Sequence, residues 1–164
     1  MLQQSIRALM AALAFAGAAA FAQTATNHFD DPFLRATSAL PGCPEPAGPR
    51  YTPEQVREEA HSRAQHGTSC YHSGRCRLPN AYLYDKEIAP RTVQYLQRDD
   101  RLADSSVWIV VQRRIVFLQG CVKSREQAET MERSVGLIDD VMGVVNQLSA
   151  PGEAAKYPLA TTNE

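Results

Sequence analysis

The sequence predicts an α+β fold in the second half of the chain, preceded by a mostly irregular N-terminal extension. Residues 107–111 and 115–122 are apolar segments of alternating character joined by the polar triplet QRR, a pattern typical of two strands in a hairpin. Apolar residues at helical spacing stand on both sides of this hairpin, and the short apolar segment GVVNQLS follows. The predicted order is therefore helix, strand, strand, helix, strand.

The first 22 residues have the features of a secretory signal peptide. They carry one positive charge, at Arg7, then an uncharged apolar run from Ala8 to Phe21 and a small-x-small pattern that ends at Ala22. We expect cleavage after Ala22 and a mature protein in the periplasm. A membrane anchor is the less favoured alternative, because a spanning helix needs about 20 apolar residues.

The mature chain is expected to contain one folded domain with segments on either side. The expected divisions are a signal peptide at 1–22, an extension at 23–85 with a helix near 53–66, the domain at 86–150, and a flexible C-terminal tail at 151–164. Removing Arg7 from the 17 basic residues leaves 16, against 18 acidic residues. A nearly neutral protein is not a typical nucleic-acid partner, so we expect no nucleic-acid binding.

One helix is predicted within the extension, after residues 23–50, which are rich in Pro, Ala and Gly. Thr52 is a suitable N-cap, Pro53 suits the first helical position, Gln55 completes a capping box, and Gly67 can end the helix. Its apolar stripe is thin and consists of Val56, Ala60 and Ala64. Such a helix is expected to pack lightly.

The two helices of the domain are predicted from capping and periodicity. Residues 89–102 form the first, with Val93 and Leu96 facing inward; a helical turn before Pro90 is not expected, because proline lacks an N–H and clashes with the carbonyl four residues back. Ser124, with Gln127 three residues later, opens the second helix through a capping box. Its inner face consists of Ala128, Met131, Val135 and Ile138.

These elements resemble the BON family, named for bacterial OsmY and nodulation proteins. The residues that match the family pattern are Val107, Ile109 and Val111, then Val116, Leu118, Gly120 and Val122, then Val141, Val144, Asn146 and Leu148. The resemblance implies a single BON domain with a three-stranded mixed sheet and two helices on one face. Two positions depart from the pattern: Arg114 and Asp140 stand where glycine is usual, so the hairpin either adopts another turn type or stores strain.

In such a domain, strand residues alternate between a helix-covered face and an outer face. The inward set is Val107, Ile109, Val111, Val116, Leu118 and Val122. The outer set includes Trp108, Val110, Phe117, Gln119, Cys121 and Val145, which is an unusually apolar surface. We expect the extension to cover this face; the alternative is that Trp108, Val110 and Phe117 form an exposed interaction patch.

The four cysteines are expected to form disulfides, because the periplasm is oxidising and their number is even. Cys121 points outward toward the extension, so we predict a Cys43–Cys121 bond and a local Cys70–Cys76 bond. A zinc site is the alternative, with the ligands His66, Cys70, His72 and Cys76, but their spacing matches no paired zinc pattern. No Cys-x-x-Cys-His motif for haem is present. We expect no metal and no cofactor.

One end of the domain is predicted to carry a phosphate-binding site for lipid. The exit of the first helix and the end of the second strand bring together Arg101, Lys123, Ser124 and Arg125. The N-terminus of the second helix begins there, and free backbone N–H groups at a helix N-terminus favour an anion. Asp99, Asp100 and Asp104 lie nearby, so a solvated rim of mixed charge is the competing interpretation.

The sequence predicts a non-catalytic protein. It contains no G-x-S-x-G, no H-E-x-x-H and no phosphate loop, and an oxidised Cys70 cannot act as a nucleophile. The family resemblance implies a periplasmic protein of envelope maintenance or osmotic stress that associates with anionic phospholipid. The alternative function is a protein-interaction module that docks another envelope component through the extension or the outer sheet face.

Overall fold

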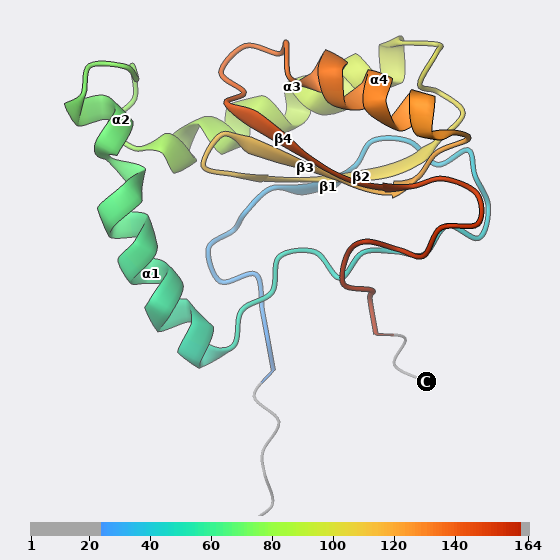
Figure 1. The fold of residues 1–164 in the computed structure, drawn as a ribbon. Helices are drawn as coiled ribbons and strands as arrows, with labels where there is room; N and C mark the ends of the chain where they lie inside the picture. Colours follow the sequence, from blue (N-terminus) through green and yellow to red (C-terminus); the bar gives the residue numbers. More distant parts are fainter. Residues whose placement is uncertain (1–23, 162–164) are drawn as a thin grey trace, which may run out of the picture.

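The structure, a computed structural model, describes residues 24–161, and the predicted signal peptide lies outside this range. Figure 1 shows one layer of helices above a sheet and irregular chain below it. The sheet is mixed and has the order β1-β2-β3-β4, with antiparallel pairing of β1 with β2 and of β2 with β3, and parallel pairing of β3 with β4. The strands are β1 (Phe33–Arg35), β2 (Ser106–Gln112), β3 (Ile115–Cys121) and β4 (Gly143–Ser149).

The α+β class and the element order of the domain are as predicted, and the strand count is not. The fourth strand, β1, comes from the extension, where Leu34 pairs with Ile109 and Arg35 with Trp108. The sequence did not indicate this strand, because three residues are too few to display an alternating pattern. Pairing with the free edge of β2 gives the strand its partner, and the sheet grows from three strands to four.

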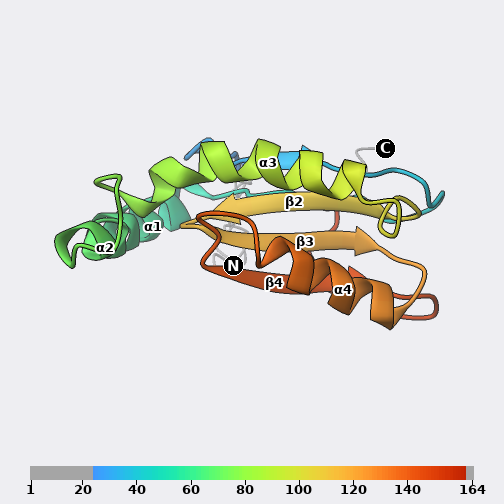
Figure 2. The ribbon, with the colours of Figure 1, turned by 90° about the horizontal axis from the view of Figure 1, so that it is seen from above.

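The two domain helices lie on the same face of the sheet. Helix α3 (Asp85–Arg98) runs along β2, and α4 (Arg125–Val135) lies beside β4 (Figure 2). Helix α3 begins before Pro90, contrary to the expectation from proline. Proline removes one helical hydrogen bond there, and the turn that precedes it is held by burial of Asp85, Ile88 and Ala89.

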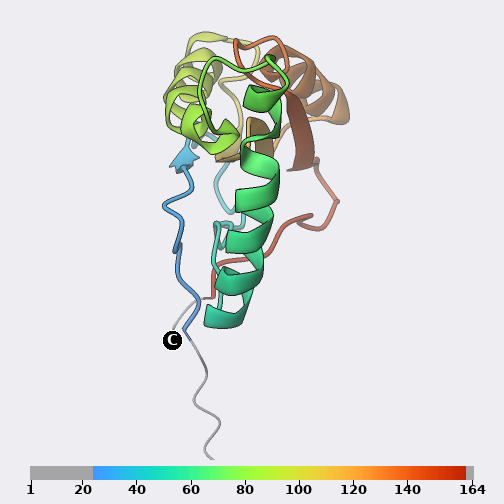
Figure 3. The ribbon, with the colours of Figure 1, turned by 90° about the vertical axis from the view of Figure 1, so that its left-hand side faces the viewer.

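The remaining helical elements belong to the extension. They are α1 (Pro53–Gly67), the short α2 (Ser69–His72) and the 3₁₀ turn η1 (Ala81–Tyr84). The predicted capping box of α1 is present, because Thr52 accepts a hydrogen bond from the Gln55 amide and Gln55 accepts one from the Thr52 amide. Within α1 only Gly67 is buried, and the helix projects away from the sheet (Figure 3).

The core lies between the sheet and the two domain helices. The six inward side chains predicted from strand alternation are all buried there: Val107, Ile109, Val111, Val116, Leu118 and Val122. They pack with Ile88 and Leu96 of α3 and with Met131 of α4. Gly120 is required in β3, because it has φ 130° and a Cβ atom would collide with the carbonyl oxygen of Ser106.

The opposite face of the sheet is covered over part of its area. Residues 43–51 of the extension and residues 150–160 after β4 run beneath the sheet in Figure 1. Trp108 is 4% exposed and Val110 is 7% exposed, so these two do not form a surface patch. Phe117 is half-buried, and Val145, its register partner on β4, is 38% exposed.

The segment after β4 was expected to be a flexible tail, but its described part, residues 151–161, packs against the extension. Leu159 forms an antiparallel bridge with Pro46. The buried Tyr157 donates a hydrogen bond from its hydroxyl to the Pro44 carbonyl, at 2.8 Å. This segment is ordered because it packs over the apolar outer face of the sheet. The composition of the segment alone does not reveal this packing.

Candidate functional site

The predicted phosphate-binding residues meet at one end of the domain. Ser124 is the N-cap of α4 and its hydroxyl accepts a hydrogen bond from the Gln127 amide, at 3.1 Å. The Gln127 side chain then joins the two neighbouring loops: it donates to the Arg101 carbonyl at 2.9 Å and accepts from the Lys123 amide at 2.8 Å. Gln127 thus holds the exit of α3 next to the start of α4.

Each cation of this end has a carboxylate partner. Arg101 pairs with Asp99 at 2.6 Å, Lys123 pairs with Asp104, and Arg125 pairs with Glu153 at 2.7 Å. Hydrogen bonds from Lys156, the Ala150 amide and Arg125 lower the pKa of Glu153 to about 2. The cations are exposed, and exposed ion pairs are weak because solvent screens them. An incoming phosphate can therefore replace the carboxylate partner of one of these cations at a small cost in free energy.

An open groove of about 640 Å³ adjoins this end and extends along α3. It is lined by three guanidinium groups, those of Arg91, Arg98 and Arg101, against the two carboxylates of Asp99 and Asp100. Tyr95 and Gln94 complete the lining. Within residues 24–161, no carboxylate forms an ion pair with Arg98.

The sequence reasoning found Arg101 but missed Arg91 and Arg98. These two residues lie about two turns apart on α3, so they share one face of the helix. That spacing is visible in the sequence. The acidic residues Asp99 and Asp100, directly after Arg98, obscure it.

The hairpin tip also carries two arginines, and the Arg114 side chain is engaged in structural contacts. Arg113 and Arg114 have φ values of 53° and 67°, so the turn stores the strain that the missing glycine implied. The Arg114 side chain donates to the Asp140 carbonyl at 2.7 Å and stacks on the Tyr84 ring. Asp140 itself has φ 70°. Arg114 therefore holds the extension and the start of β4 to the hairpin.

The buried Asp85 of α3 caps this strained tip. Its carboxylate accepts a hydrogen bond from the Arg113 amide and another from the Arg114 amide, each at 2.7 Å. Burial raises the pKa of Asp85 to about 6, although the two amide hydrogen bonds act in the opposite direction. The sequence reasoning did not single out Asp85.

A second buried charge, Asp31, joins the extension to the domain. It accepts two hydrogen bonds from Arg63 of α1, at 2.8 and 2.6 Å, one from the Tyr51 hydroxyl and one from the Gln112 amide group. The Arg63 guanidinium also lies over the rings of Phe29 and Tyr82, at 4.1 and 4.2 Å from their centroids. This cluster fixes the base of α1, and its bonds leave no free charge for a ligand.

Both predicted disulfides are confirmed. Cys43 is bonded to Cys121 and Cys70 to Cys76. The sulfur ligands of the alternative zinc site are thus consumed by a disulfide. Among the residues that the structure describes, no group of three or more His, Cys, Asp or Glu side chains is arranged to hold a metal ion.

The groove on α3 carries groups that can bind an anion. No helix between residues 24 and 161 combines the length and the apolar character that crossing a bilayer requires. The groove gathers Arg91, Arg98 and Arg101 on one surface, beside the carboxylates of Asp99 and Asp100. This arrangement can hold an anion by charge and hydrogen bonds.

Comparison with known proteins gives one match. A family model described as "BON domain" matches residues 84–152. No curated protein and no solved structure was found to match the chain. The matched range contains α3, β2, β3, α4 and β4, the five elements whose order and pattern resembled that family. BON domains are generally non-catalytic and are associated with phospholipid or with the cell envelope. Residues 84–152 of this chain therefore form a single BON domain.

Proposed function

We propose that the protein is a non-catalytic, periplasmic envelope-maintenance or stress-related protein whose BON domain binds anionic phospholipid headgroups. The observation that carries the proposal is the groove on α3, where Arg91, Arg98 and Arg101 line one open surface. Arginine forms paired hydrogen bonds with phosphate oxygens, so a row of guanidinium groups suits a layer of phosphate headgroups.

The end of the domain where the phosphate-binding residues were predicted extends this surface. Gln127 places Arg101 beside the α4 N-terminus, where Lys123 and Arg125 are exposed. The basic surface then consists of Arg91, Arg98, Arg101, Lys123 and Arg125. The acidic partners of these residues keep the surface weakly basic, which favours reversible attachment to a charged bilayer. Export is supported by the signal-peptide pattern and by two disulfides, which form in oxidising compartments.

Cosedimentation with vesicles tests this function. The oxidised chain from Gln23 is mixed with phosphatidylglycerol vesicles or phosphatidylcholine vesicles, at low and at high salt. We expect binding only to the anionic vesicles and a loss of binding at high salt, because screening weakens exposed charge pairs. Absence of binding to both kinds of vesicle contradicts the proposal.

Charge-matched variants locate the surface. The double substitution Arg98→Ala with Arg101→Ala should weaken binding to anionic vesicles severalfold. Adding Lys123→Ala and Arg125→Ala to this variant should weaken the binding further. The control is Arg50→Ala with Arg57→Ala, which removes the same charge from the extension, where both side chains bond only to backbone carbonyls. Equal losses in the control and the test variants would indicate attraction by net charge alone.

Docking of another envelope protein is the second candidate. It is favoured by the outer sheet face, where the half-buried Phe117 lies beside the exposed Val145. Protein docking predicts indifference to lipid charge and sensitivity to Phe117→Ser. The same vesicle experiment separates the two functions, since protein docking alone gives no sedimentation with lipid.

A further inference from the structure

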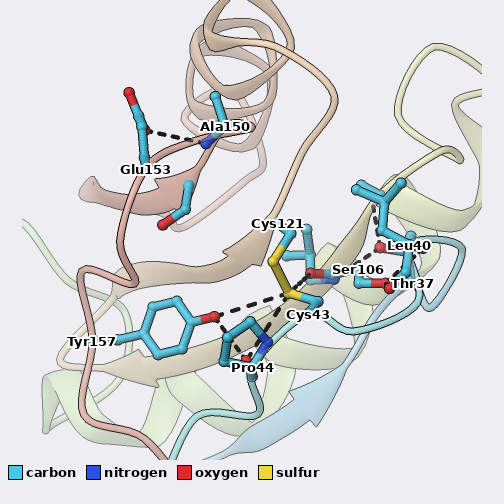
Figure 4. Close-up of a disulfide and its surroundings, with 12 residues drawn as sticks. Thr37, Leu40, Cys43, Pro44, Ser106, Cys121, Ala150, Glu153 and Tyr157 are labelled. Carbon is cyan, nitrogen blue, oxygen red and sulfur yellow. Dashed lines mark hydrogen bonds between the residues drawn. A yellow bond between two sulfur atoms is a disulfide. The ribbon is translucent and has the colours of Figure 1, made fainter.

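The Cys43–Cys121 disulfide joins the two layers of the molecule at an open position. Cys43 belongs to the extension, and Cys121 is the last residue of β3 on the outer face of the sheet. Both line a cavity of about 320 Å³ between residues 40–44 and 149–157. Figure 4 shows the sulfur atoms between the Tyr157 ring and the strand that carries Ser106.

This disulfide lies where the outer cover is attached. On one side of Cys43, the Ser106 hydroxyl bonds with the amide and the carbonyl of Leu40, at 2.9 Å each. On the other side, the Tyr157 hydroxyl donates to the Pro44 carbonyl. These hydrogen bonds, the disulfide, the bond from the Ala39 amide to the Ser105 carbonyl and the Pro46–Leu159 bridge hold the segment around Cys43 in place. The disulfide is the covalent part of the attachment.

The cover protects an apolar surface that includes the sole tryptophan. Trp108 is buried on the outer face, with the Arg35 guanidinium of β1 stacked on its ring at 4.6 Å. A Trp and a Val that become exposed together would form an apolar patch of the kind that binds protein or lipid. Val110, two residues after Trp108 on β2, lies on the same face of the sheet. Opening of the cover would therefore create a binding surface.

The other disulfide has a different setting. Cys70 and Cys76 are six residues apart, and the bond closes a small loop next to α2. Cys76 is buried, and the Arg114 guanidinium lies 3.0 Å from its sulfur. Cleavage there would release only the loop. Cys43, Cys70 and Cys121 are all half-buried, so the two bonds differ in the burial of Cys76 and in what they hold.

We propose that Cys43–Cys121 is a reducible latch, opened through this cavity by a dithiol and closed by oxidation, which controls exposure of the outer sheet face. A thiolate of the dithiol attacks one sulfur to form a mixed disulfide, and the other cysteine leaves as a thiolate. The second thiol of the reductant then resolves the mixed disulfide. The reductant ends as a disulfide and the protein gains two electrons and two protons.

Selective reduction is the first test. The oxidised chain from Gln23 is treated with increasing dithiothreitol under native conditions, free thiols are alkylated, and peptides are analysed by mass spectrometry. We expect Cys43 and Cys121 to be alkylated at a lower reductant concentration than Cys70 and Cys76. Prior alkylation of Cys70 and Cys76, or reduction of all four only when the protein unfolds, overturns the proposal.

Fluorescence of Trp108 is the second test, and it requires no variant. Reduction of Cys43–Cys121 should move the Trp108 emission to longer wavelength and raise its quenching by acrylamide severalfold. Reoxidation should reverse both changes. Far-UV circular dichroism must stay near the oxidised spectrum. An unchanged emission after complete reduction of Cys43–Cys121 shows that the bond does not control the cover.

Two variants complete the design. Cys43→Ser with Cys121→Ser should show the shifted emission permanently and ignore dithiothreitol. Cys70→Ser with Cys76→Ser should keep the buried emission of Trp108 and still respond to the reductant. Oxidised-like emission in the first variant contradicts the latch. None of these outcomes depends on lipid binding, so the latch and the proposed function fail or stand separately.

Discussion

The carboxylate of Asp85 on α3 binds the backbone amide of Arg114 at the tip of the β2–β3 hairpin, at 2.7 Å. The neighbouring Arg113 amide is bound in the same way. Hairpin turns with positive φ at both central residues normally use Asn-Gly, since arginine is strained in this conformation. A buried carboxylate that satisfies both amides offsets part of that strain.

Removal of the carboxylate should destabilise the protein. We expect Asp85→Ala to lower the free energy of unfolding by about 2–4 kcal/mol, because two partly buried amides lose their buried acceptor. Urea unfolding followed by Trp108 fluorescence measures this loss. Glu87→Ala is the matched control on the same helix: its ion pair with Arg77 is exposed and screened by solvent, so its loss should change the stability much less. Similar losses in the two variants would show that Asp85 does not hold the turn.

The same carboxylate should make stability depend on pH. The pKa of Asp85 is raised to about 6 by burial, whereas its ordinary value is 3.8. The folded protein thus binds a proton at a pH where the unfolded chain does not. The stabilisation that comes from protonation of Asp85 is therefore complete below about pH 4 and is lost as the pH rises through about 6. The free energy of unfolding of the wild type, relative to Asp85→Ala, should increase from pH 7 to pH 4. A constant difference over this range contradicts the raised pKa.

Relief of strain at the tip should stabilise the protein. Arg113 has φ 53°, a region that asparagine tolerates better than arginine. Arg113→Asn should therefore raise the free energy of unfolding by about 0.5–1 kcal/mol, seen as a higher Tm. Arg113→Ala removes the same side chain and keeps the strain, so it should show no gain. A gain in both variants would point to the arginine charge as the cause.

The Arg63–Asp31 pair should be essential for docking of α1. Both side chains are largely buried, so Arg63→Ala leaves the Asp31 charge without its main partner and should cost about 3 kcal/mol. Arg57→Ala, on the exposed side of α1, should cost less than about 0.5 kcal/mol. Thermal unfolding of both variants measures the difference. Faster proteolysis within α1 of Arg63→Ala would show that the loss is local.

The parts of the fold that local pattern predicts are those with several turns or alternations. Helix α4 and the hairpin β2–β3 have capping residues and alternating apolar residues, and the Cys43–Cys121 pairing followed once alternation placed Cys121 on the outer face. Strand β1 has three residues and no such signal. Its existence depends on the unpaired edge of β2, a tertiary property that no single segment contains.

The charged clusters were harder to predict than the elements. Asp31 and Arg63 are 32 positions apart, and Asp85 meets the hairpin tip 28 positions later. Neither pair has a characteristic spacing, since each forms only when separate elements pack. The residues of the proposed phosphate site were predicted in part, because helix ends and strand ends follow from element order. The arginines on the face of α3 follow from a spacing that the charged neighbours obscure.

The pairing of the cysteines also constrains the order in which folding and disulfide formation can occur. The Cys70–Cys76 bond is nested inside the segment closed by Cys43–Cys121. In the proposed export, Cys43, Cys70 and Cys76 enter the oxidising compartment before Cys121, so oxidation in order of arrival would join Cys43 to Cys70. The native pairing requires Cys43 to wait for β3 or to be exchanged later. Its correct oxidation therefore reports that the segment around Cys43 has reached the end of β3.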